Sequence, residues 1–193
     1  MNDDATVQKI TFALSDVFAS FFAIVGLVAG IIILAVSPDA TMRFHGAIVI
    51  VGCAIFIGKL ARNESDHHNS NVIKAAVIST LLWSIFGFSV GLFVELQLNI
   101  PDLNFDLPWT NYGRLLPLHT TIMIFALCGN ALLASSLYVL QQSCGNIRGH
   151  HAPWFVFIGF NVFNVMLTSG VILGVTSARE YFEPEWYQVL WLA

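Results

Sequence analysis

Long apolar runs without charged residues dominate this chain, and short polar stretches separate them. Five such runs stand out, at residues 17–36, 44–58, 75–94, 115–147 and 150–178. About 20 apolar residues are needed for a helix to cross a bilayer, so four of the runs are long enough. The second run has to include its flanks, with Lys59 and Arg62 extending their charged ends toward water. The pattern predicts an all-α, multi-span transmembrane helix bundle with five spans.

A further apolar stretch at residues 187–193 is too short to cross a membrane. It has the pattern of the first turns of a sixth helix. We therefore expect the chain to be a fragment of a longer protein, or one piece of a larger assembly.

Composition supports a membrane protein and excludes several other classes. Hydrophobic residues make up 56% of the chain and charged residues only 10%, which is far from the composition of soluble proteins. The net charge of −4, with no basic patch, argues against a nucleic-acid partner. The first apolar run is too long for a cleavable signal peptide. Three cysteines, Cys53, Cys128 and Cys144, form neither a disulfide framework nor a metal or haem-attachment motif.

The strongly polar stretch at residues 62–71 divides the chain into three parts. We expect an amino-terminal transmembrane helix pair at 1–61, a polar cytoplasmic loop at 62–71, and a block of helices at 72–193. Basic residues near the spans are unevenly distributed, with Lys9, Lys59, Arg62, Lys74 and Arg148 on one side and Arg43, Arg114 and Arg179 on the other. The excess of positive charge predicts a cytoplasmic amino terminus.

An arginine at the mouth of the fourth span is followed by a histidine just inside it, at Arg114 and His119. A polar ring within a membrane span is costly and usually has a function. The chemistry that fits is axial ligation of a haem iron, with the arginine near the haem propionates. A histidine hydrogen-bonded between helices is the open alternative. We expect Pro117 in the first turn of the helix, with His119 about two residues inside its start.

The other histidines have weaker claims to a function. His45, at the start of the second span, is the only partner that could join His119 on a haem within this chain, although a histidine at the interface needs no special role. Two adjacent pairs, His67–His68 and His150–His151, lie in polar segments without a zinc-binding spacing. Solvation explains both pairs adequately.

Three carboxylates gather in the segment after the fifth span, at Glu180, Glu183 and Glu185. Carboxylate oxygens are ligands for hard cations, so this segment could hold calcium. A solvated cap at the end of the span explains the composition equally well.

The sequence LNFDLPWTNYGRLLPLHT at residues 103–120 resembles the catalytic subunit (subunit I) of cbb3-type cytochrome c oxidases, within the haem-copper oxidase superfamily. The stretches IFA at 124–126, GNAL at 129–132 and YVLQ at 138–141 continue the resemblance, as does the segment at 176–186. It covers about residues 72–193, in the right order and spacing. Residues 1–61 are similar to the extra amino-terminal helices of some members.

The resemblance implies roles for three residues. His119 would be one axial ligand of the low-spin haem b, Arg114 would lie near its propionates, and Glu180 would match a carboxylate near a calcium ion that bridges the propionates. The second haem ligand, the high-spin haem and the copper site of that family belong to helices beyond residue 193. The chain alone would therefore lack the oxygen-reducing centre.

The resemblance also implies a setting and partners. Electrons would pass from c-type cytochrome subunits through the low-spin haem to oxygen, in aerobic respiration at a bacterial inner membrane. The remaining oxidase helices, or a second polypeptide supplying them, would complete the site.

Two departures from the family pattern keep other functions open. Leu116 stands where the family usually has a second arginine, and Gly159-Phe160-Asn161 stands where a tryptophan and a glutamine are usual. Weaker haem retention would follow. One alternative is therefore a haem-free structural or assembly subunit derived from an oxidase, and another is a self-contained cytochrome b using His45 and His119.

Overall fold

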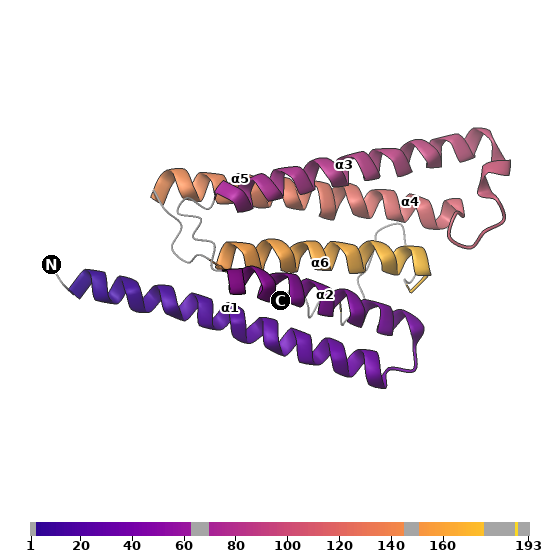
Figure 1. Cartoon of the computed structure of the whole chain (residues 1–193). Coiled ribbons are helices and arrows are strands. Elements are labelled where there is room, and N and C mark those ends of the chain that lie inside the picture. The colour runs from indigo at the N-terminus through magenta and orange to yellow at the C-terminus, as the bar shows by residue number, and fades with distance from the viewer. Residues whose placement is uncertain (1–2, 63–69, 145–150, 176–187, 189–193) are drawn as a thin grey trace. The chain divides into compact units, whose positions relative to one another are not determined.

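The computed structural model describes residues 3–62, 70–144, 151–175 and 188, and none of these residues forms a strand (Figure 1). The α-helices are α1 (Asp3–Val36), α2 (Ala40–Arg62), α3 (Ser70–Asn99), α4 (Tyr112–Thr121), α5 (Gly129–Cys144) and α6 (Ala152–Leu173). Five helical stretches are long and apolar enough to cross a membrane, so the predicted all-α, five-span architecture is confirmed. The predicted start of a sixth span at 187–193 lies outside the described residues, apart from Gln188.

The fourth span combines three helical segments into one stretch, Tyr112–Cys144. A π-helical segment, η2 (Ile122–Cys128), connects α4 to α5 without interruption. A π-helical turn widens the backbone spiral and is often found near functional sites. Here it begins three residues after His119.

The fifth span ends at Leu173, before the predicted limit of 178, and its last turn explains why. Gly174 has φ +76, a left-handed conformation that terminates a helix and suits glycine. Its amide donates to the Val171 carbonyl (3.1 Å), and the Val175 amide donates to the Gly170 carbonyl (3.0 Å). These two bonds form a Schellman motif, which satisfies carbonyls that the end of the helix leaves unpaired.

The helices belong to two compact units. The first comprises residues 1–74 and 135–162, and the second comprises residues 75–134 and 163–193. The predicted three-part division around residues 62–71 is a different partition of the chain, and it stays a prediction.

Close packing of α1 against α2 is the main feature of the first unit (Figure 1). The two helices approach at Gly30 and Gly46, where a Cβ at Gly46 would lie 3.1 Å from the Gly30 carbonyl oxygen. Small residues allow this kind of backbone approach between membrane helices. A second contact places the Phe56 and Phe155 rings edge to face, with centroids 5.3 Å apart.

Lys59 also takes part in this unit. Its ammonium lies 3.2 Å from the centroid of the Trp154 ring, a cation–π contact, where extension into water was predicted. The side chain of Arg62, predicted to extend in the same way, lies outside what the structure describes.

We expect the substitution Gly46→Val to destabilise the helix pair by about 1–3 kcal/mol, because added atoms would force the α1 and α2 backbones apart. The free energy of unfolding, measured by titrating a denaturing detergent into purified protein, tests this. Gly58→Val on the same helix is the matched control, because a Cβ there meets nothing within 4 Å. Equal stability of the two variants would contradict the predicted close approach.

Candidate functional site

The start of α4 is set by a loop that folds around Gln97 in the second unit. The Gln97 Nε2 donates to the carbonyls of Leu103 (3.2 Å) and Thr110 (2.7 Å). A short 3-10 helix, η1 (Pro101–Asn104), occupies part of this loop. The Asn111 side chain then caps α4 by accepting from the Gly113 amide at 2.8 Å.

This cap corrects the predicted position of Pro117. The helix begins at Tyr112, so Pro117 lies inside α4 and not in its first turn. Its missing N–H removes the bond that the Gly113 carbonyl would otherwise accept. His119 consequently lies seven residues after the first helical residue, or about 10 Å along the axis, where about two residues were predicted.

The imidazole of His119 lies against α3, which runs beside α4 in Figure 1. Its Nδ1 is 2.9 Å from the backbone oxygen of Gly87. A Cβ built at Gly91 would come within 2.6 Å of the ring Cε1 and 2.8 Å of Nδ1. The ring therefore occupies space that any other residue at position 91 would fill.

This contact shows which ring nitrogen of His119 carries a hydrogen. A carbonyl oxygen only accepts hydrogen bonds, so Nδ1 must carry the hydrogen. In neutral imidazole the other nitrogen, Nε2, then has the lone pair. Nε2 makes no hydrogen bond in the part of the chain that the structure describes. Nε2 is therefore the His119 nitrogen that could bind a metal.

The apolar core of this unit fixes which side of α4 faces its neighbours. Leu115, Leu118 and Ile122 are buried in one cluster with Val94 of α3 and Val171 of α6. Leu116 and Ile124 lie on a different side of the fourth span and are exposed, while His119 is half-buried between the two sides. Leu116 is three residues before His119 and is therefore its neighbour on the helix surface.

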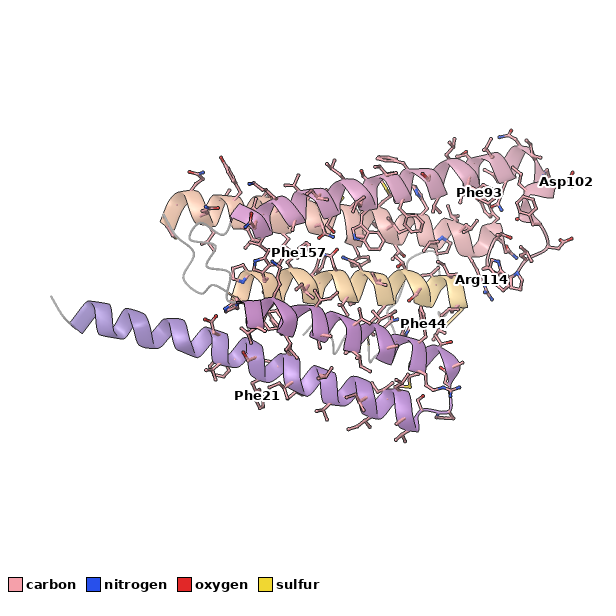
Figure 2. The ribbon with its side chains drawn as sticks, viewed as in Figure 1. Phe21, Phe44, Phe93, Asp102, Arg114 and Phe157 are labelled. Carbon is pink, nitrogen blue, oxygen red and sulfur yellow. The ribbon has the colours of Figure 1, made fainter. Side chains whose placement is uncertain are left out.

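Arg114 connects α4 to the end of α6, as Figure 2 shows. Its Nη1 donates to the Ile172 carbonyl at 3.1 Å. A Cβ at Gly174 would lie 2.7 Å from Nη2, so the guanidinium rests directly on this glycine. The Ile172 carbonyl lies in the last helical turn, where carbonyls lack helical partners and positive charge is favoured. Arg114 therefore already has a structural task.

Other predicted site residues fall outside this constellation or outside the described chain. Glu180, Glu183, Glu185, His67, His68 and His150 are all outside the described residues. His45 is buried, with 1% of its surface exposed, and belongs to the first unit. The backbone N–H of His151 donates to the Asp16 carboxylate at 3.3 Å, which ties the start of α6 to α1. No cluster of three His, Cys, Asp or Glu side chains able to hold a metal ion occurs among the described residues.

Two glycines near His119 were missed by the sequence analysis. Gly87 and Gly91 form a Gly-x-x-x-Gly pattern on α3, the spacing that allows close approach of membrane helices. The spacing itself was the signal that could have identified them.

Some buried polar groups in this unit also gave no signal in the sequence. The Thr121 hydroxyl and both polar atoms of the Asn164 amide are buried and have no hydrogen-bond partner among the described residues.

The fold and site define a multi-span helical membrane protein with a metal-competent histidine at a helix–helix contact. A family model described as "Cytochrome C and Quinol oxidase polypeptide I" matches residues 71–193. The chain therefore belongs to this family, and the predicted resemblance is confirmed at that level. Membership implies haem cofactors.

Several relatives support the assignment. The chain is 50% identical over 131 residues to a cytochrome c oxidase subunit 1 homolog (bacteroid) of Bradyrhizobium diazoefficiens, covering 67% of this chain and 24% of the relative. It is 38% identical over 135 residues to a Cbb3-type cytochrome c oxidase subunit of Stutzerimonas stutzeri, covering 67% and 28%. The match to cytochrome c oxidase subunit 1 of Rhodobacter capsulatus is 35% identical over 185 residues, covering 87% and 35%.

The extent of these matches is informative in two ways. The chain spans only about a quarter to a third of the length of these relatives. Residues 62–193 make up about two thirds of the chain, so the match over 87% must extend into residues 1–61. The amino-terminal helix pair is thus part of the similarity to the Rhodobacter protein.

We expect Arg114→Leu to destabilise the protein by about 1.5–3 kcal/mol even when no haem is available, because the Ile172 carbonyl loses a charged hydrogen-bond donor. Unfolding in detergent of protein from haem-depleted cells measures this. Arg43→Leu, at an exposed arginine of α2, is the control and should change stability little. Equal effects of the two substitutions would show that the contact with α6 is unimportant.

Proposed function

We propose that this chain is the amino-terminal membrane part of a cbb3-type haem-copper oxidase catalytic subunit and supplies one axial ligand of a low-spin haem b. One observation carries the proposal: the Gly87 carbonyl holds the hydrogen on Nδ1 of His119 and leaves the Nε2 lone pair available. Most metal-ligating histidines are oriented in this way by a second hydrogen bond. When bound, such a haem relays single electrons.

The donor set around His119 fits one haem ligand better than a bare metal ion. A single imidazole is too few ligands for a structural zinc site, which needs about four. A haem iron is already bound by four porphyrin nitrogens and needs only axial ligands from the protein. Leu116 and Ile124, exposed on the fourth span, give an apolar surface beside His119 that suits a porphyrin.

We infer the rest of the assembly from the resemblance of residues 103–120 to the cbb3-type subunit. The second haem ligand and the oxygen-reducing centre would come from further oxidase helices or a second polypeptide, and electrons would come from c-type cytochrome subunits. We place the protein in a bacterial plasma membrane with its amino terminus in the cytoplasm. Glu180 is proposed to join the calcium site beside the propionates.

Arg114 would serve two groups in this proposal. Its Nη1 is engaged by the Ile172 carbonyl, but a guanidinium has five N–H donors. The remaining donors could reach a propionate near the mouth of α4. Arg114 is the only arginine within the described fourth span, and Leu116 stands where the family usually has a second one.

The first test of the proposal is His119→Ala, which we expect to abolish the b-type signal of the low-spin haem. The signal is measured as a reduced-minus-oxidised spectrum of the chain purified with its natural partners. His45→Gln is the comparison variant and should leave the spectrum unchanged. Loss of the signal in both variants would favour a self-contained cytochrome b. Wild-type protein that is folded and attached to partners but lacks haem would instead identify a structural subunit.

Leu116→Arg should strengthen haem retention. One charged hydrogen bond to a propionate is worth about 1.5–3 kcal/mol, so haem loss to an excess of a haem-scavenging protein should slow by roughly 10-fold or more. Leu116→Gln is the matched control, because it adds a polar group without charge at the same position. Equal rates in the two variants would contradict an approach of the propionates to this face of α4.

A further inference from the structure

We propose that residues 87–91 of α3 form a seat for the His119 imidazole, in which Gly91 positions the ring and the Gly87 carbonyl keeps the hydrogen on Nδ1. The inference rests on the proposed function and adds two positioning residues to it. Neither glycine contributes a side chain. Their effect comes from the backbone oxygen of one and the empty space of the other.

The space at Gly91 is filled by the ring itself. A Cβ there would lie 2.6 Å from Cε1, 2.8 Å from Nδ1 and 3.2 Å from Nε2 of His119. Favourable contacts between carbon atoms begin at about 3.5 Å. Because all three crowded atoms belong to one rigid ring, a side chain at position 91 must displace the imidazole as a whole.

Gly87 has a different and separable task. A Cβ there would meet the Ile122 Cγ2 at 2.9 Å and the Met123 Sδ at 3.1 Å, and its three nearest neighbours include no atom of the ring. Its small size therefore allows α3 and η2 to approach, while its backbone oxygen accepts from Nδ1. A helical carbonyl has a second lone pair beyond the one used by the amide four residues later, so it can accept this extra bond.

The seat would affect the strength of His119 as a haem ligand as well as the position of its ring. A hydrogen bond from Nδ1–H makes the imidazole more electron-rich, so Nε2 becomes a stronger ligand. An electron-rich ligand favours the ferric over the ferrous iron. Loss of the bond should therefore weaken haem binding and raise the reduction potential.

Three alanine substitutions separate these tasks in the complete chain, purified from native membranes with its partners. Gly91→Ala crowds the ring directly, whereas Gly87→Ala crowds Ile122 and Met123 and acts on the ring only by moving its acceptor carbonyl. Gly159→Ala on α6 meets no atom within 4 Å and is the open-space control. Haem retention, the midpoint potential and the electron paramagnetic resonance (EPR) spectrum of the ferric low-spin haem are measured for each.

We expect Gly91→Ala to retain the haem about 10- to 100-fold more weakly, the usual effect of disturbing a ligand's outer support. The haem that remains should show a raised midpoint potential and an altered low-spin EPR spectrum. Gly87→Ala should raise the midpoint potential by lengthening the bond to Nδ1, with a smaller loss of haem than Gly91→Ala. Gly159→Ala should keep the wild-type spectrum and potential. If Gly91→Ala matches Gly159→Ala in all three measurements, the seat does not position the ring.

If Gly91→Ala fails to accumulate, a measurement on the wild-type protein still tests the hydrogen bond from Nδ1 to Gly87. Pulsed EPR of the remote imidazole nitrogen distinguishes an Nδ1–H that donates a hydrogen bond from one that does not. A bonded signature supports the seat and a free one overturns it. If the haem is unchanged in His119→Ala, the proposed function is wrong. If His119→Ala lacks haem but Gly91→Ala behaves like wild type, the proposed function stands and only the seat is wrong.

Discussion

The contact between α3 and the fourth span is the constraint on which the candidate site depends. Within a bilayer no water is available to satisfy a polar ring, so an imidazole there needs a protein partner. The partner is a backbone oxygen, that of Gly87, and it is reachable because positions 87 and 91 lack side chains. The hydrogen bond that orients His119 therefore depends on the close approach of α3 to the fourth span. A change that separates the helices would also release the hydrogen on Nδ1 from its acceptor.

Helix ends supply the second set of constraints. The Asn111 cap starts α4 early enough to place His119 two turns inside it, and Gln97 holds the loop before that cap. At the carboxyl end of α6, Gly174 terminates the helix and Arg114 donates to the Ile172 carbonyl in its last turn. The charge and the helix end stabilise each other. Arg114 thereby holds the end of α6, at Ile172 and Gly174, against α4.

The spans were predictable from sequence because the bilayer imposes a simple length and polarity rule. The ends of the spans were harder to predict. If Pro117 were the first helical residue, the cap would be residue 116, but the cap is Asn111, five residues earlier. Likewise the apolar run to residue 178 carried no mark of the turn at Gly174 beyond the glycine itself. Short-range polar contacts decide helix ends, and hydropathy does not contain them.

Residue type and depth alone were enough to select His119 and Arg114 as candidate site residues, but the groups that hold them could not be predicted. Gly87 lies 32 residues from His119 and Ile172 lies 58 residues from Arg114. Both contacts are made by backbone oxygens, which leave no trace in residue identity. This also changes the meaning of Leu116. With part of the Arg114 guanidinium bound to α6 and a leucine at position 116, α4 would have fewer charged donors for the propionates. Haem retention in this chain would thus depend more on the seat of His119 than on its propionate contacts.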